Sequence, residues 1–135
     1  MPGARPITPG LFTEGTEGPR LLAARCAACG KAHFPAGPVC PYCGVDGVVA
    51  TPVGPEGRLY LYTAVASAPP GYHGEVPYGF GVVELEGGLR VIARLTEWRL
   101  ERLRPGLPMH LVVEPLFRDG EGRTVLCYAF RPESA

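Results

Sequence analysis

Three features of the sequence predict a mainly β fold, with a small metal-bound lobe on the N-terminal side of a five-stranded barrel. Four of the five cysteines form two Cys-x-x-Cys pairs: Cys26 with Cys29, and Cys40 with Cys43. After residue 57, apolar and polar residues alternate in short runs that Gly and Pro separate. These runs read as three strands, a short helix and two more strands, which is the order of the Greek-key barrel called the OB-fold.

The composition fits one compact unit, or one small domain with a metal-stabilised appendage, in a chain of 135 residues. Gly (19) and Pro (16) together reach a level at which disorder becomes plausible. However, 46% of the residues are hydrophobic, and they occur in runs. This pattern favours short strands joined by tight turns over an unfolded chain.

The charge balance and the apolar runs bear on partners and location. The chain has 13 basic and 13 acidic residues, and Lys31 is its only lysine. Because proteins that bind polyanions usually have a basic excess, we expect no nucleic-acid partner. No apolar run approaches the roughly 20 residues that span a bilayer, and Met1–Gly10 lacks the layout of a secretory signal. We therefore expect no membrane partner and a cytoplasmic location, where paired cysteines favour metal over disulfide.

The N-terminal part divides into an arm and a metal-binding domain. Residues 1–20 are expected to form an N-terminal arm, because Gly and Pro are too frequent there for a stable core element. The apolar pair Leu11–Phe12 leaves two possibilities: a disordered tail, or an arm that docks on a partner or on the barrel. Residues 21–50 hold the clustered cysteines. Residues 51–135 form the predicted barrel domain, which begins with a linker at Thr51–Gly57.

The first barrel strand is predicted at Arg58–Ala66 and is followed by a long loop, Ser67–Pro77, rich in Gly and Pro. A regular strand would place two sets of side chains on opposite faces: Leu59, Leu61, Thr63 and Val65, against Tyr60, Tyr62, Ala64 and Ala66.

A hairpin follows, formed by strands at Tyr78–Glu86 and Leu89–Leu95. A three-residue loop, Glu86-Gly87-Gly88, gives consistent partners across it: Leu85 with Leu89, Val83 with Val91, and Glu84 with Arg90 on the other face. A two-residue turn would mix apolar and charged partners on one face. The three-residue loop, with glycine in the left-handed position, is therefore favoured.

The C-terminal part is predicted to contain a short helix and two strands. Thr96–Leu103 has a possible N-cap in Thr96, and Pro105-Gly106 stops the helix. The last strands are expected at Met109–Phe117 and Arg123–Phe130, joined by a turn over residues 119–122.

The two Cys-x-x-Cys turns have the spacing of a four-sulfur metal site. Each turn aims two thiolates at one point, and the glycine after its second cysteine leaves room for the backbone to curl around the ion. Zinc favours such a tetrahedral shell. Iron in a rubredoxin-like site, two redox pairs and four free thiols are the alternatives. A shell of four sulfur ligands leaves no coordination position open for water, so the predicted metal site is structural and not catalytic. Cys127 is expected to be a small core residue.

No catalytic residues emerge from the sequence. His33, His73 and His110 lie in three separate segments, and no nucleophile elbow, phosphate loop or dinucleotide motif is present. The chain therefore reads as a binding or scaffolding module. Its candidate binding residues lie in the loop Pro69–Phe80, which carries four rings suited to a flat ligand or a protein groove: Tyr72, His73, Tyr78 and Phe80. Alternatively, Tyr78 and Phe80 open the next strand and pack inward.

Several segments together resemble a known family. A rubredoxin-like ribbon (CAACGKAHFPAGPVCPYCG), a strand (GRLYLYTAV), a loop (PPGYHGEVPYGFGVVEL) and a closing YAFRP resemble the zinc-ribbon plus OB-fold proteins described as acyl-CoA-associated. The likeness extends from about Leu21 to Pro132. It implies a rubredoxin-like zinc ribbon followed by a five-stranded OB-fold barrel, with the four paired cysteines as zinc ligands.

The resemblance also implies a function. Members are non-catalytic subunits of thiolase-fold enzymes, including lipid-transfer-type aldolases of steroid side-chain degradation and thiolases of aromatic degradation. Such a subunit would complete the partner's active site and share acyl-CoA as a ligand with it in a hetero-oligomer. The rings of Tyr72, His73, Tyr78 and Phe80 would then contact acyl-CoA or the partner, and Leu11–Phe12 would belong to the partner-binding region.

Three other functions stay open at this point. Some relatives in the resembled family accompany hot-dog-fold enoyl-CoA hydratases, so the partner could be a hydratase. An OB-fold nucleic-acid binder would use aromatic stacking platforms, for which the candidates are Tyr60, Tyr62, Tyr72 and Tyr78. A stand-alone enzyme would have to turn over an acyl-CoA without a partner.

Overall fold

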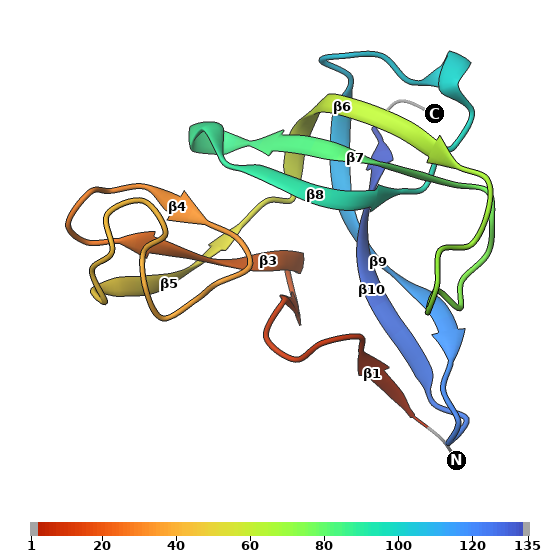
Figure 1. The fold of residues 1–135 in the computed structure, drawn as a ribbon, viewed down its shortest axis with the longest axis horizontal. Coiled ribbons are helices and arrows are strands. Elements are labelled where there is room, and N and C mark those ends of the chain that lie inside the picture. The colour runs from red at the N-terminus through yellow and green to blue at the C-terminus, as the bar shows by residue number, and fades with distance from the viewer. Residues whose placement is uncertain (1–2, 134–135) are drawn as a thin grey trace.

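The computed structural model describes residues 3–133, and its regular secondary structure is almost entirely β-strand, arranged in two sheets (Figure 1). The smaller sheet, here called the ribbon, contains β2 to β5. The larger sheet closes into the barrel. No helix in the described part of the chain is long and apolar enough to cross a membrane.

The ribbon is organised around β3 (Gly18–Cys26), which pairs with a strand on each edge. On one edge it pairs antiparallel with β5 (Val48–Val53). On the other edge, β2 (Phe12–Gly15) pairs with its first half and β4 (Ala32–His33) with its last residues. The ribbon therefore carries Cys26 at the end of its central strand.

The barrel has five strands: β6 (Glu56–Val65), β7 (Tyr78–Leu85), β8 (Arg90–Leu95), β9 (Pro108–Arg118) and β10 (Thr124–Pro132). β10 pairs antiparallel with β9 and parallel with β8, while β9 also pairs with β6, so the sheet closes on itself. This is the predicted OB-fold. β9 and β10 continue below the barrel as a long hairpin, where β1 (Ala4–Pro6) pairs parallel with β10 (Figure 1).

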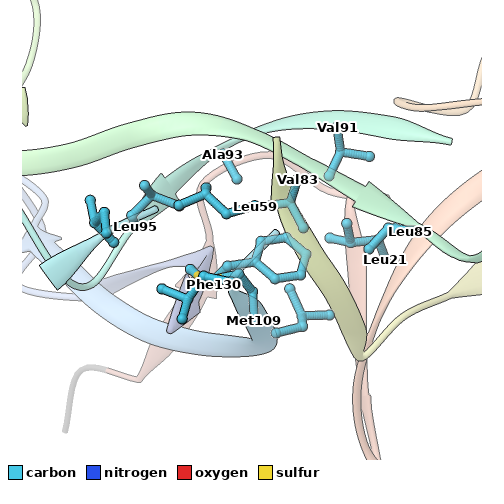
Figure 2. Close-up of a cluster of buried hydrophobic side chains, with 12 residues drawn as sticks. Leu21, Leu59, Val83, Leu85, Val91, Ala93, Leu95, Met109 and Phe130 are labelled. Carbon is cyan, nitrogen blue, oxygen red and sulfur yellow. The ribbon is translucent and has the colours of Figure 1, made fainter. Parts of the chain in front are cut away.

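The core fills the barrel and extends to the ribbon. Twelve buried side chains make up this cluster, nine of them labelled in Figure 2. Phe130 of β10 is completely buried among aliphatic side chains from the other barrel strands. Leu21 of β3 is also completely buried in the same cluster, and Phe12 and Phe34 pack against it. The ribbon and the barrel therefore share one hydrophobic core.

The β7–β8 hairpin confirms the predicted register. Val83 lies opposite Val91 and Glu84 opposite Arg90. Gly87 and Gly88 take the left-handed conformation, with φ angles of 85° and 86°, which glycine adopts without steric cost. The outward pair Glu84–Arg90 forms a salt bridge of 3.0 Å.

The predicted helix at Thr96–Leu103 is wrong. Only Leu100–Arg102 forms a single 3₁₀ turn, and the N-cap position is Arg99 in extended conformation. The Glu97 carboxylate accepts hydrogen bonds from the backbone N–H groups of Trp98 and Arg99, at 3.0 Å each. The N–H of Thr96, the predicted N-cap, donates to the Phe130 carbonyl at 2.9 Å and so ties the start of the segment to β10. A segment of eight residues also lacks the length to form a stable α-helix by itself.

Two N-terminal expectations also change. The segment expected to be a linker, Thr51–Gly57, is mostly strand: Thr51–Val53 belongs to β5, and β6 begins at Glu56. Residues 1–20 contain strands β1 and β2 and the start of β3, although no regular element was expected there. Residues 1 and 2 of the predicted arm lie outside the described part of the chain.

A β-bulge breaks the alternation predicted for β6. Leu59 lies opposite Val83 but Leu61 lies opposite Val82, so Tyr60 is an extra residue in the ladder. Leu59 is buried, whereas Tyr60 and Leu61 are both exposed, and Tyr62 packs against the core. A bulge shifts every later side chain to the other face. Leu61 therefore points to solvent and Tyr62 points inward, opposite to the prediction.

Asp119 holds the β9–β10 turn together. Its carboxylate accepts hydrogen bonds from the Arg5 side chain at 2.8 Å and from the backbone N–H groups of Glu121 and Arg123 at 2.9 Å each. The Arg5 bond, followed by the backbone bonds, holds the pKa of Asp119 well below its usual range. Because only the ionised carboxylate is stabilised in this way, the bonds favour the folded state where Asp119 is charged.

We expect Asp119→Asn to lower the free energy of unfolding at pH 7, because a neutral amide loses the charge-assisted bonds from the Arg5 and Arg123 side chains. The pKa is depressed in the folded state, so this contribution is present above about pH 4 and is lost as the pH falls through the folded-state pKa. The difference between wild type and variant in urea unfolding should therefore shrink below pH 4. The exposed residue Glu86, changed to Gln, is the control. A difference that is independent of pH would contradict the assignment.

Candidate functional site

The four paired cysteines come together at one end of the ribbon. The Sγ atoms of Cys26, Cys29, Cys40 and Cys43 all lie within 4.8 Å of one another. The Sγ atoms of Cys26 and Cys43 are 3.5 Å apart, and those of Cys29 and Cys40 are 3.7 Å apart. In a tetrahedral shell with metal–sulfur bonds of about 2.3 Å, neighbouring sulfurs are about 3.8 Å apart. The cluster therefore has the spacing that a single metal ion requires.

The two Cys-x-x-Cys turns have the same backbone structure. In each, the N–H of the following glycine donates to the carbonyl of the first cysteine, at 2.9 Å: Gly30 to Cys26, and Gly44 to Cys40. Both glycines have positive φ angles, 77° and 81°. The N–H of each first cysteine bonds to the carbonyl five residues later, Lys31 or Val45. The repeated pattern presents the two sulfur pairs to each other from opposite sides.

Backbone N–H groups also point at the sulfurs. Cys26 Sγ accepts hydrogen bonds from the N–H groups of Cys29 and Ala28, at 3.4 and 3.3 Å, and Cys40 Sγ accepts one from Tyr42 at 3.4 Å. The Cys29 bond, with smaller help from Ala28, lowers the pKa of Cys26 to about 6 against the opposing effect of burial. The pKa of Cys43 moves the other way, to about 11 against the opposing backbone bond at Val45, because its sulfur bonds to the Cys26 sulfur and is desolvated. Without an ion the two sulfurs therefore share a proton, whereas a metal ion binds the thiolate form of each cysteine.

Cys127, the fifth cysteine, lies in β10 and outside this cluster. The sequence predicts a small core residue here, and Val125 and Ala129 of the same strand are both completely buried. Cys127 itself is only half-buried, and a register shift between Val125 and Leu126 precedes it in the ladder with β9. Burial raises the pKa of its thiol. The thiol therefore lacks the activation that a nucleophile needs.

The four rings predicted to bind a ligand separate into three places. Tyr72 and Tyr78 pack together, with ring centroids 4.7 Å apart, and Tyr78 is buried. His73 lies against Phe117 of β9, at 5.3 Å. Phe80 is exposed on the outer surface of β7. The alternative that Tyr78 packs inward is what the structure has, whereas Phe80 points outward.

The four tyrosines considered as a stacking platform for a nucleic acid do not form one exposed surface either. Tyr78 is buried and Tyr62 is partly buried against the core, so neither ring is fully exposed. Of the four tyrosines, Tyr60 is exposed, but its ring is already covered by Arg90, whose guanidinium carbon lies 3.8 Å from the ring centroid.

Comparison with known protein families finds a match for the ribbon part and for the barrel part of the chain. Residues 14–49 match the model of the ChsH2 rubredoxin-like zinc ribbon domain, and residues 50–114 match that of the ChsH2 C-terminal OB-fold domain. The chain belongs to the ChsH2 family. The zinc ribbon of this family corresponds to the ribbon sheet with its four clustered cysteines, and the OB-fold domain begins within β5.

Relatives of this ChsH2-family chain have different names. A DUF35 domain-containing scaffold protein of Pyrococcus furiosus is 31% identical over 84% of this chain and 83% of its own. The benzoylsuccinyl-CoA thiolase subunit BbsA of Thauera aromatica is 29% identical over 91% of this chain and 85% of its own. A probable enoyl-CoA hydratase alpha subunit of Thermomonospora curvata is 35% identical, over 75% of this chain and 31% of its own.

A solved structure has a similar fold. It is described as the Ltp2-ChsH2(DUF35) aldolase, and its matching chain superimposes with a TM-score of 0.62 and 32% identity over 84% of both chains. The aldolase component thus shares the architecture of this ChsH2-family chain, and the scaffold protein and the thiolase subunit are similar to it in sequence. These similarities are consistent with a non-catalytic subunit of an enzyme complex.

Two surfaces of the ChsH2-family chain were missed from the sequence. One is a cavity of about 440 Å³ between the ribbon and the β7–β8 turn, whose lining includes Arg25, Lys31, Tyr42 and Arg90. The other is the outer face of β6, β7 and β8, which exposes several apolar side chains. Neither could be found by local pattern, because the first joins segments far apart in sequence and the second depends on the bulge at Tyr60.

Proposed function

We propose that this chain is a non-catalytic subunit that binds a thiolase-fold enzyme, either a lipid-transfer-type aldolase or a thiolase of steroid side-chain or aromatic degradation. It would complete the partner's active site and help to hold acyl-CoA. The observation that carries the proposal is the match over 84% of both chains to a component of the Ltp2-ChsH2(DUF35) aldolase. The similarity to a thiolase subunit supports the same class of partner.

The placement of the histidines supports a non-catalytic role. His33 Nε2 accepts a hydrogen bond from the Gly37 N–H at 3.0 Å, His73 lies against Phe117, and His110 Nδ1 is 3.5 Å from a carboxylate oxygen of Glu133. Each histidine therefore has a separate structural neighbour. We infer that the nucleophile and the base belong to the partner.

We propose that the four clustered cysteines bind a structural zinc ion, consistent with their spacing and with the zinc-ribbon family model. Zinc would supply a rigid four-sulfur cross-link between the two Cys-x-x-Cys turns. Cys26 is anchored at the end of β3, and the other three cysteines lie in turns. Holding these turns together fixes the ribbon surface that faces the barrel.

The cavity between the ribbon and the β7–β8 turn supports the acyl-CoA part of the proposal. Arg25, Lys31 and Arg90 contribute three cations to its lining, and Glu86 contributes one carboxylate. Lys31 Nζ lies 5.1 Å from the centre of the exposed Tyr42 ring. Cations gathered in one cavity suit the phosphates of CoA. We further propose that the loop bearing Tyr72 and His73, with Phe80 beside it, approaches the partner's active site.

A tagged copy of the chain, captured from the native cell extract, tests the proposal. We expect a thiolase-fold enzyme in near-stoichiometric amount, identified by mass spectrometry. The purified enzyme should turn over its acyl-CoA faster with this chain than alone. Recovery of an enoyl-CoA hydratase would replace the proposed partner by the other class of relative. Turnover of an acyl-CoA by the chain alone would contradict the non-catalytic assignment.

A further inference from the structure

Two cavities adjoin between the ribbon and β8. The first is the cavity of about 440 Å³ described above, whose lining includes residues 30–32 of the ribbon and residues 86–90 of the β7–β8 turn and β8. The second has a volume of about 330 Å³, and its lining includes residues 34–35 of the ribbon and β8 from Arg90 onward. Arg90 lines both cavities, and the two linings advance together along the ribbon and along β8. We call the two cavities together the ribbon–β8 trough.

The end of the trough at the β7–β8 turn is cationic. Arg25 and Lys31 line it, and neither lies within ion-pair distance of a carboxylate in residues 3–133. Arg25 also donates to the carbonyl of the glycine that ends the first Cys-x-x-Cys turn, at 2.8 Å, which holds its side chain there. Arg90 adds no net charge, because Glu84 pairs with it. Two unpaired cations thus face Glu86, the one unpaired carboxylate among the described lining residues, and this end favours phosphate groups.

The other end of the trough is largely apolar. Its lining includes Phe34, Ile92 and Tyr128. The Phe34 and Tyr128 rings meet edge to face, with centroids 5.6 Å apart, and the Tyr128 hydroxyl donates to the Ile92 carbonyl at 3.0 Å. These contacts fix the ribbon side and the β8 side of the cavity relative to each other. Arg94 also lines this end, but it pairs with Glu114 and so offers no unpaired charge. This end therefore suits an uncharged, apolar group.

The two ends of the trough match the two halves of a CoA molecule. The nucleotide half carries a diphosphate and a 3′-phosphate, whereas the pantetheine arm is uncharged and has methyl groups next to the diphosphate. A nucleotide without the arm would leave the apolar end exposed to water, and an acyl chain without phosphates would leave the two cations without a partner. A ligand that has both parts fills both ends.

We propose that the ribbon–β8 trough binds acyl-CoA lengthwise, with its phosphates at Arg25 and Lys31 and its pantetheine arm beside Phe34 and Ile92. This inference rests on the proposed function and deepens it, because it assigns each half of the ligand to a separate part of this chain. The acyl group is attached to the far end of the arm, so it lies beyond the apolar end of the trough. Recognition of the acyl chain is then left to the partner.

Calorimetric titration of the purified, metal-loaded chain with three probes tests the two ends separately. The probes are CoA, adenosine 3′,5′-bisphosphate, which has the phosphates without the arm, and pantetheine, which is the arm without the phosphates. We expect CoA to bind at least about tenfold more tightly than either part, because the second contact of a linked ligand is intramolecular. Higher salt should weaken the binding of CoA and of the bisphosphate but not that of pantetheine.

Two variants with matched controls assign the ends to residues. Lys31→Gln should weaken the binding of CoA and of the bisphosphate by about tenfold and leave pantetheine unchanged. Ile92→Ser should weaken the binding of CoA and of pantetheine and leave the bisphosphate unchanged. The controls are Arg131→Gln, which removes an exposed cation of β10, and Val49→Ser, whose side chain is 60% exposed against 61% for Ile92. Both controls should bind CoA like wild type, and all four variants should keep their metal.

The possible outcomes separate this inference from the proposed function. If CoA does not bind to the chain, or binds no better than the bisphosphate, this inference is overturned, while capture of a thiolase-fold enzyme would still support the proposed function. If CoA binds as expected and no thiolase-fold enzyme is captured, the trough stands and the proposed partner is wrong. If Lys31→Gln or Ile92→Ser binds all three probes like wild type, the trough is not the site.

Discussion

Changing Cys40 to serine is expected to abolish metal binding and to unfold the ribbon. Cys40 is almost completely buried, and its sulfur accepts the Tyr42 N–H within the second Cys-x-x-Cys turn. A structural zinc ion contributes roughly 10 kcal/mol or more to folding in small zinc domains, which exceeds the stability of most domains of this size. We expect the metal content, measured by elemental analysis, to fall from about one ion per chain to near zero.

The effect should extend beyond the ribbon. Because Leu21 of β3 lies in the same buried cluster as the barrel residues, loss of the ribbon exposes part of the barrel core. We therefore expect a lower melting temperature for the whole chain. Cys127→Ser is the matched control, since Cys127 lies outside the sulfur cluster, and it should keep its metal. Full metal occupancy in the Cys40→Ser variant would show that the four-sulfur assignment is wrong.

Changing Phe130 to alanine is expected to lower the free energy of unfolding by about 3–5 kcal/mol. Phe130 is completely buried, and its ring lies in the middle of the cluster in Figure 2. β10 is the strand that closes the barrel, paired with β8 on one side and β9 on the other. The neighbouring strands are therefore held in place and cannot collapse into the space that the ring leaves.

Urea unfolding of the metal-loaded protein measures this loss, with Phe80→Ala as the control. Phe80 has the same side chain but is exposed, so its removal leaves no cavity and should change stability little. Equal effects at positions 80 and 130 would mean that the barrel core is not packed as described.

The elements predicted correctly are those with a local physical cause. The two cysteine turns, each with its glycine, have the spacing of metal ligands regardless of what surrounds them. The β7–β8 hairpin was determined by parity, since only one loop length places Val83 opposite Val91. The barrel strands were recognisable because Gly and Pro separate their apolar runs. The order of these strands led to the OB-fold, although the helix that was part of this prediction is only a single 3₁₀ turn.

The elements that were missed depend on contacts distant in sequence. The helix pattern at Thr96–Leu103 competes with a distant contact, the backbone bond from Thr96 N–H to the Phe130 carbonyl. The bulge at Tyr60 requires Gly81 of the neighbouring strand, which no pattern within β6 reveals. For the same reason, the aromatic loop was a single candidate site in the sequence but separates into three places in the structure.

The position of Leu21 makes the metal centre and the barrel two halves of one cooperative unit. β3 ends at Cys26 and, five residues earlier, places Leu21 against the barrel core. A recombinant fragment that begins at the barrel would therefore have a solvent-accessible gap where Leu21 belongs, and would tend to aggregate. Conversely, a shortage of zinc during synthesis would reduce the amount of soluble barrel as well as of ribbon. The availability of zinc in the cell would thus determine how much of the chain is available to any partner.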